Sequence, residues 1–263
     1  MGIALVTGAS SGIGKELARL FARDGHGVVL VARRRERLEE LARELESKHG
    51  VKAWAIACDL AAASGVERLV SELGSLGLGV DYLVNNAGVG TTGPFAESNP
   101  AAEVAMAELN VTAVVRLTRA LLPAMLARGQ GRILNIGSTA GFQPGPYMAT
   151  YYASKAFVNH FTEALAYELR GSGVSVTLYC PGPTQTEFGE VSGVGHSKLF
   201  QLQVATAESV AQAAYRALVA GRVLAVHGFL NRLAVALLRV GPRSWVRAIV
   251  ASLNRPAALR SAR

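Results

Sequence analysis

Short runs of apolar residues alternate along this chain with longer stretches in which apolar residues recur at helical spacing. The runs that we interpret as strands lie at 3–7, 27–32, 51–57, 81–85, 131–137, 174–180 and 222–227. Helical patterns lie between them, among them 15–23, 36–48 and 101–128. Strands that alternate with helices form a parallel sheet with helices on both faces. The strand at 28–31 is apolar at every position, as expected when both faces are covered. The pattern predicts a doubly wound α/β fold of about seven strands.

The pattern changes after residue 228, where residues 229–263 read as two amphipathic helices divided at Gly241-Pro242. We therefore predict a main domain at 1–228 and a helical extension at 229–263. An apolar face of this length must be covered by something. It can pack on the body near the substrate, join a subunit interface, or lie on an anionic membrane. We favour packing on the body or on a subunit, because most amphipathic helices serve a core.

Composition and charge narrow the class of protein. Half of the 263 residues are hydrophobic and 17% are charged, which indicates a globular chain. The net charge of +8 comes from the C-terminal end, because 209–263 holds nine arginines and no acid, whereas the rest holds 18 bases and 19 acids. A near-neutral body argues against binding to nucleic acid. The chain starts with a strand pattern and has no apolar run of ~18 residues, so we expect a cytoplasmic protein.

Metal ligation is not indicated. The two cysteines, Cys58 and Cys180, have no metal-ligand spacing, and the five histidines are scattered singly.

The first strand is followed by Thr-Gly-x-x-x-Gly-x-Gly at 7–14. Glycines at such a turn let the backbone approach a phosphate, and the N-terminus of the next helix offers free N–H groups. An ordinary tight turn is the alternative for this motif taken alone.

A second motif, Tyr151-Tyr152-Ala153-Ser154-Lys155, places a phenol and an ammonium on one helix face. A free tyrosine has a pKa near ~10. An ammonium at ~4 Å in an effective dielectric of ~20 supplies about 4 kcal/mol, which would lower that pKa by ~3 units. Tyr151 would then serve as a general acid/base. The alternative is an unremarkable pair on a surface helix.

Several motifs occur together and in a fixed order: 7–14, Asp59-Leu60, Asn85-Asn86-Ala87-Gly88, Asn110, Ser138, Tyr151 with Lys155, and Pro181-Gly182. In this order the chain resembles the short-chain dehydrogenase/reductase family, in its single-domain branch, over roughly residues 3–227. The resemblance implies a Rossmann-like fold with strand order 3-2-1-4-5-6-7, a nicotinamide cofactor and a homodimer or homotetramer. With that order, Cys58 and Cys180 lie about five strand spacings apart, or ~24 Å, and are expected to be free thiols.

The resemblance also assigns catalytic roles. Tyr151 transfers the proton, Lys155 tunes it and binds ribose, Ser138 orients the substrate oxygen, and Asn110 holds a water in a proton relay. Ser138 could instead be a loop or cap serine, and Asn110 a structural kink in its helix.

The second strand ends in Arg33-Arg34-Arg35, where a carboxylate would bind the ribose of NAD. Arginine suits a 2′-phosphate, so we expect NADP(H) to be preferred over NAD(H). Many NADP-preferring relatives also have a basic residue where this chain has Ser11. Asp59 resembles the acid that contacts adenine, or could cap a helix that begins near Ala61. The cofactor-binding residues expected from the resemblance are Gly8, Ser10, Ser11, Gly12, Ile13, Gly14, Arg33, Arg34, Asp59, Leu60, Asn86, Ala87, Gly88, Tyr151, Lys155, Pro181, Gly182, Thr184 and Thr186.

Substrate contacts are expected between Ser138 and Tyr151, from Phe142, Gln143, Pro144, Tyr147 and Met148. They are also expected from the glycine-rich loop at 184–204, which contains Phe188, Leu199 and Phe200. Apolar residues on such a loop indicate an apolar carbonyl or alcohol. The sequence therefore predicts an NADP(H)-dependent oxidoreductase that interconverts a carbonyl and an alcohol. The alternatives are a nucleotide sensor without turnover, and a lipid or 3-oxoacyl reductase at a membrane surface.

Overall fold

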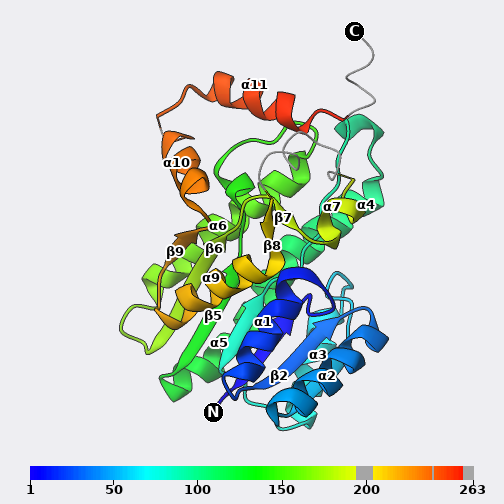
Figure 1. The fold of residues 1–263 in the computed structure, drawn as a ribbon, viewed down its shortest axis with the longest axis vertical. Helices are drawn as coiled ribbons and strands as arrows, with labels where there is room; N and C mark the ends of the chain where they lie inside the picture. The colour runs from blue at the N-terminus through cyan, green and yellow to red at the C-terminus, as the bar shows by residue number, and fades with distance from the viewer. Residues whose placement is uncertain (194–203, 239, 257–263) are drawn as a thin grey trace.

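A seven-stranded parallel sheet forms the centre of the protein. The computed structural model describes residues 1–193, 204–238 and 240–256. The order across the sheet is β3-β2-β1-β4-β5-β6-β9, as the family resemblance implied. These strands are β1 (Ile3–Thr7), β2 (Gly27–Ala32), β3 (Ala53–Ala57), β4 (Tyr82–Asn85), β5 (Gly131–Ile136), β6 (Val174–Cys180) and β9 (Leu224–Val226). Because all six pairings are parallel, the carboxyl ends of the strands meet at one edge (Figure 1).

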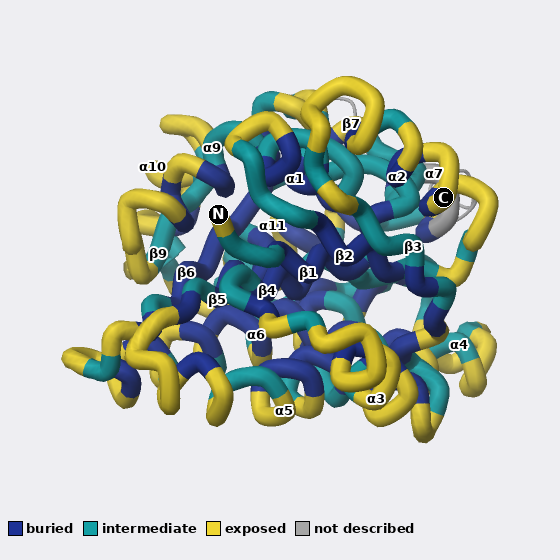
Figure 2. The backbone as a smooth tube through the Cα atoms, turned by 90° about the horizontal axis from the view of Figure 1, so that it is seen from below, coloured by how far each residue is buried: buried dark blue, intermediate teal, exposed yellow. Residues whose placement is uncertain are grey.

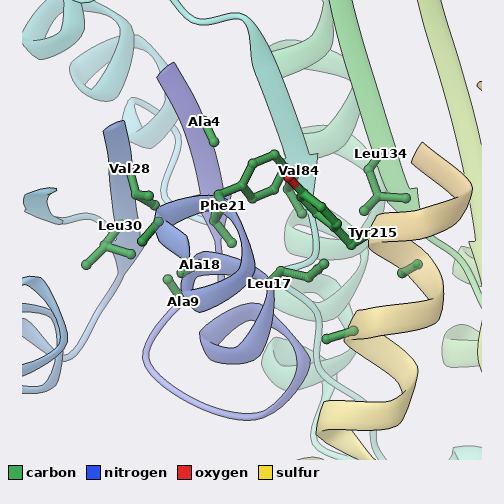
Figure 3. Packing of buried hydrophobic residues seen from close by; sticks show 14 of the residues in the cluster. Ala4, Ala9, Leu17, Ala18, Phe21, Val28, Leu30, Val84, Leu134 and Tyr215 are labelled. Atoms are coloured by element: carbon green, nitrogen blue, oxygen red, sulfur yellow. The ribbon is translucent and has the colours of Figure 1, made fainter. Parts of the chain in front are cut away.

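Helices cover both faces of the sheet, so the fold is the predicted Rossmann-like one (Figure 2). One face carries α1 (Gly12–Arg23), α2 (Arg35–His49) and α9 (Ala207–Val219); the other carries α3 (Gly65–Ser75), α5 (Ala113–Arg128) and α6 (Ala149–Glu168). On the first face, Phe21 of α1 packs edge-on against Tyr215 of α9, with ring centroids 4.9 Å apart (Figure 3). Leu17 and Leu134 are fully buried in the same cluster.

The helix predicted at 101–128 is three elements in the structure: α4 (Pro100–Ala107), a π-helical turn η2 (Glu108–Thr112) and α5. Asn110 lies in the middle of the π turn, and its buried amide bonds to the backbone of another segment. A wider turn of this kind is common at functional sites. Five short elements complete the main domain: η1 (Phe95–Glu97), η3 (Thr139–Phe142), β7 (Thr184–Gln185), α7 (Glu187–Val191) and β8 (Ala205–Thr206).

The whole run 100–128 is also long and apolar enough to cross a membrane, and it is the only such helix in the described residues. It belongs to the core, however, because Ala113, Leu117 and Met125 pack beneath the sheet. Both cysteines are free and buried, as expected.

The extension forms α10 (Phe229–Leu238) and α11 (Arg243–Asn254), divided at the predicted Gly241-Pro242. We call these two helices the C-terminal helix pair. They lie beyond the carboxyl edge of the sheet, at the top of Figure 1. Val250 packs with Met148 and Tyr152 of the main domain, and the Tyr152 hydroxyl donates to Asn254 Oδ1 at 3.2 Å. The predicted contact between the extension and the body is therefore present on this side of α11.

Candidate active site

A cavity of about 700 Å³ runs along the carboxyl edge of the sheet and under the C-terminal helix pair. Its walls come from the ends of β1, β2, β4, β5 and β6, from α7, and from α10 and α11. Ligands of open α/β sheets bind at this edge. The cavity is therefore the candidate active site.

The glycine-rich turn after β1 is shaped for close approach. Gly8 has φ +68°, in the left-handed region that favours glycine, and a Cβ on Gly14 would lie 2.4 Å from the Gly8 carbonyl oxygen. Thr7 joins β1 to β4: its hydroxyl donates to the Val84 carbonyl and accepts from the amides of Asn86 and Ala87. The turn thus presents the N-terminus of α1 to the cavity, where a phosphate can bind.

Arginine and glutamate side chains meet at the β2 end of the cavity. Arg34 donates to the hydroxyls of Ser10 (3.0 Å) and Ser11 (3.1 Å) and to Glu187 of α7 (2.7 Å). Hydrogen bonds from Arg37 and Arg34 lower the pKa of Glu187, which is therefore a carboxylate at neutral pH. Sequence reasoning missed this residue, because it lies far along the chain from the arginines it contacts.

Arg33 is exposed, and Arg33 and Asp59 both line the cavity. Asp59 Oδ1 accepts from the Ala61 amide at 3.0 Å, but α3 begins only at Gly65. Asp59 therefore closes a local turn and caps no helix, so that alternative is wrong.

Tyr151 and Lys155 lie on the same face of α6, as the spacing predicted. The Lys155 ammonium is buried and donates to the Ile136 carbonyl at 2.9 Å. Burial lowers the pKa of Lys155 to about 8. Burial raises the pKa of Tyr151 to about 12, against the opposing effect of its hydrogen bond with Ser138. The prediction that neighbouring protein groups lower the pKa of Tyr151 is wrong, because desolvation of the phenolate outweighs their effect.

Ser138 lies at the end of β5, with its hydroxyl accepting from the Ala140 amide at 3.0 Å. Ser138 therefore caps η3, which confirms the alternative of a cap serine, and it also forms a hydrogen bond with Tyr151. Its backbone is held by Asn159, whose amide donates to the Ser138 carbonyl at 3.1 Å. Asn159 is fully buried on α6, four residues after Lys155. Sequence reasoning missed it, although a polar residue at i+8 from Tyr151 on one helix face was the available signal.

Asn110 lies behind the cavity wall. Its amide donates to the Val89 carbonyl (2.9 Å) and to Ser154 Oγ (3.0 Å), and its Oδ1 accepts from the Val89 amide (3.0 Å). A Cβ on Gly88 would lie 3.2 Å from Asn110 Oδ1 and 3.5 Å from Lys155 Nζ. The backbone at Gly88 thus covers both polar groups, and Asn110 holds this segment in place.

The substrate end of the cavity is mainly apolar. Phe188 lines it as predicted, 5.2 Å from Tyr151 between ring centroids. Phe142 and Tyr147 do not line it: Phe142 closes η3, and Tyr147 has φ +66° with its carbonyl bonded to the Gly93 amide. Gln143 and Met148 line it as expected. Further apolar lining comes from the C-terminal helix pair, namely from Ala234, Val235, Leu237, Leu238, Ile249, Val250 and Leu253.

The structure brings most of the predicted cofactor residues together along this cavity. Those in its lining are Gly8, Ser10, Ser11, Gly12, Ile13, Arg33, Arg34, Asp59, Leu60, Asn86, Ala87, Gly88, Tyr151, Lys155, Pro181, Gly182, Thr184 and Thr186. Gly14 is not in the lining and serves the packing of α1 on the turn. Leu199 and Phe200 lie outside the described residues.

Comparisons with known proteins agree with this geometry. A family model for short chain dehydrogenases matches residues 2–193. Sulfoacetaldehyde reductase 2 of Chromohalobacter salexigens is 40% identical over 188 residues, which cover 71% of this chain and 74% of that protein.

Two solved structures match over almost the whole length. A short-chain dehydrogenase from Sphingobium yanoikuyae in complex with NADPH is 33% identical with a TM-score of 0.82, and the match covers 94% of this chain and 97% of that one. The bulky-bulky ketone specific alcohol dehydrogenase from Comamonas testosteroni is 31% identical with a TM-score of 0.78, covering 94% and 95%. The chain therefore belongs to the short-chain dehydrogenase family, whose members are oxidoreductases that act on carbonyl and alcohol groups.

Proposed function

We propose that the protein is an NADP(H)-dependent oxidoreductase that interconverts an apolar carbonyl compound and its alcohol, with Tyr151 as the general acid/base. One observation carries the proposal. The Tyr151 hydroxyl, bonded to Ser138, lies in a cavity with arginines at one end and apolar walls at the other.

NADP(H) fits the end of the cavity that Arg33 and Arg34 line. Arg33 is exposed and offers planar, bidentate donors for a 2′-phosphate, and Arg34 adds positive charge while it bonds to Ser10, Ser11 and Glu187. The Gly8 turn leaves room for a pyrophosphate at the start of α1. The relative from Sphingobium yanoikuyae, which matches over nearly its whole length, is a complex with NADPH. When bound, the nicotinamide supplies or accepts the hydride.

The protein's own groups handle the proton. In reduction, Ser138 and Tyr151 donate to the carbonyl oxygen while hydride adds to its carbon, and the Tyr151 proton completes the alcohol. A raised tyrosine pKa does not hinder this direction, because an alkoxide is far more basic than a phenolate. We assign Lys155, one helical turn after Tyr151 on the same face of α6, to stabilise the phenolate until it regains a proton. We assign Asn110 to that relay through its hold on Val89.

The apolar side chains that line the substrate end of the cavity indicate the class of substrate. At the substrate end the described lining has Met148, Phe188 and apolar residues of α10 and α11, and Lys155 is the only cation there. A charged substrate would need a further partner, because an unpaired buried charge is costly. This lining supports a bulky apolar ketone or aldehyde.

NADPH oxidation tests the proposal with pairs of ketones of equal length, one with an apolar end and one with a carboxylate. We expect kcat/KM to be at least about tenfold higher for the apolar member, as desolvation of an unpaired carboxylate requires. Preference for the carboxylate would refute the substrate class. Tight NADPH binding without turnover of any ketone or aldehyde would identify a nucleotide sensor instead.

A further inference from the structure

The C-terminal helix pair has two apolar sides, and the described residues of the main domain cover only one of them. On the inner side, Val235 and Val250 are 8% and 4% exposed, and Asn254 bonds to Tyr152 and to the Pro146 carbonyl. The position of the helices is thus fixed by contacts with the domain. Packing on the body therefore does not explain the apolar residues on the other side.

The outer side holds large apolar residues that are strongly exposed. They are Phe229 (71%), Leu230 (60%), Leu233 (47%), Leu237 (58%), Val240 (80%), Trp245 (70%) and Ile249 (60%). On α10, the residues at 229, 233 and 237 follow one another at i, i+4 and i+8, opposite the buried Val235, and Figure 2 shows this helix exposed. Exposed apolar residues gathered in this way mark an interaction surface.

Charge selects the partner of this surface. Arg232, Arg243 and Arg247 are exposed, and none of them forms an ion pair within the described residues. No acidic residue occurs anywhere in 209–263. A second copy packed symmetrically on this face would bring two arginine-bearing helix pairs together with no acid of 209–263 to pair with them, which costs energy. Anionic phospholipid is complementary in both respects, since it offers negative headgroups above an apolar layer.

We propose that the outer side of the C-terminal helix pair docks the protein on an anionic membrane surface. Leu237 and Ile249 belong both to this surface and to the cavity lining. If the proposed function is right, an apolar carbonyl compound can pass from the lipid to Tyr151 along an apolar path. The docking itself does not depend on that function.

Vesicle flotation of the full-length protein tests the docking without substrate. We expect binding to vesicles of phosphatidylcholine with a quarter of phosphatidylglycerol at low salt, and loss of binding at high salt or on phosphatidylcholine alone. Each arginine near the surface is worth about fivefold in affinity. Arg243→Gln with Arg247→Gln should therefore weaken binding about 25-fold. The matched control, Arg43→Gln with Arg119→Gln on exposed parts of α2 and α5, should leave binding unchanged.

Tryptophan fluorescence tests the orientation. The chain has two tryptophans, Trp54 and Trp245, so Trp54→Phe leaves Trp245 as the only reporter. We expect its emission to shift to shorter wavelength on anionic vesicles, and Phe229→Ser with Leu233→Ser to abolish flotation while NADPH binding persists. Equal weakening by the control pair, or no flotation at all, would overturn the proposal. If light scattering then shows that Phe229→Ser with Leu233→Ser splits an oligomer, the occupant is a second copy.

Discussion

Two regions of this molecule depart from the usual distribution of polar and apolar residues, in opposite directions. The cluster that we propose to be catalytic, with Asn110, Ser138, Tyr151 and Lys155 and with Asn159 holding the backbone of Ser138, places polar groups in the interior; we call it the catalytic cluster. The C-terminal helix pair places large apolar groups on the surface. Most proteins bury the second kind of residue and expose the first.

The two departures are compensated differently. Every member of the catalytic cluster has a hydrogen-bond partner inside the protein, as buried polar groups require. The outer side of the helix pair has no comparable cover among the described residues. The comparison teaches that a satisfied buried polar cluster indicates chemistry done within the chain, whereas an uncovered apolar face indicates a partner outside it.

The largest expected effect is on kcat, and it should distinguish Tyr151 from the adjacent Tyr152. Tyr151→Phe keeps the ring and removes the proton, so kcat should fall by about 10²–10⁴ with cofactor affinity little changed. Tyr152→Phe is the matched control, because its hydroxyl donates to Asn254 of the helix pair and to no catalytic group among the described residues, and kcat should stay within about twofold. Steady-state kinetics with NADPH decides this, and near-normal turnover by Tyr151→Phe would remove it from the mechanism.

The second prediction concerns the arginines at the cofactor end. A charge-assisted contact is worth ~1.5–3 kcal/mol, so NADPH should bind at least about tenfold more tightly than NADH. Arg33→Asp should reverse that order, measured by calorimetry. Arg35→Asp is the control, because Arg35 is exposed and pairs with Glu39 on the surface of α2. Equal affinities for the two cofactors in the wild type would show that the arginines are only solvated.

Sequence reasoning predicted the catalytic cluster better than the helix pair, for a physical reason. The turn at Gly8 and the face shared by Tyr151 and Lys155 follow from short-range spacing that the chain itself fixes. The strand order was implied by the family resemblance that these motifs carry. The π turn at Asn110 was not predicted, because its hydrogen bonds to Val89 come from another segment. For α11, the helical spacing predicted which residues form the apolar face. It did not predict that Val250 is buried while Trp245 is exposed. That division depends on tertiary contacts.

The third prediction concerns Asn254, whose hydrogen bonds join α11 to the main domain. Asn254→Ala leaves the buried Tyr152 hydroxyl and the Pro146 carbonyl without their partner, a cost of about 1–3 kcal/mol. We expect α11 to loosen, so KM for a bulky apolar ketone should rise about tenfold while kcat changes little. Ser252→Ala, on the exposed side of α11, should leave both constants unchanged. A fall in kcat with KM unchanged would show that Asn254 acts on Tyr151 instead.

The smallest expected effect measures what the catalytic cluster costs in stability. Burial lowers the pKa of Lys155 from 10.5 to about 8, so between these values the unfolded chain binds more protons than the folded one. Stability therefore rises with pH across this window, and the penalty is fully present below about pH 8. Tyr151, whose pKa burial raises to about 12, affects stability only above about pH 10.

Urea unfolding near pH 7 and near pH 9.5 should show a gain in the wild type that Lys155→Met lacks, with a difference of about 1–2 kcal/mol. Burial raises the pKa values of the Cys58 and Cys180 thiols, so their contribution to stability falls as the pH rises. Both proteins contain these thiols, so the difference between the wild type and Lys155→Met reports on the lysine. Arg119→Met, on the exposed side of α5, should show the wild-type gain, because this side chain lies in solvent and away from Lys155. If Lys155→Met gains as much stability as the wild type over this range, the lysine is not buried in the charged form, and the catalytic cluster carries no such cost.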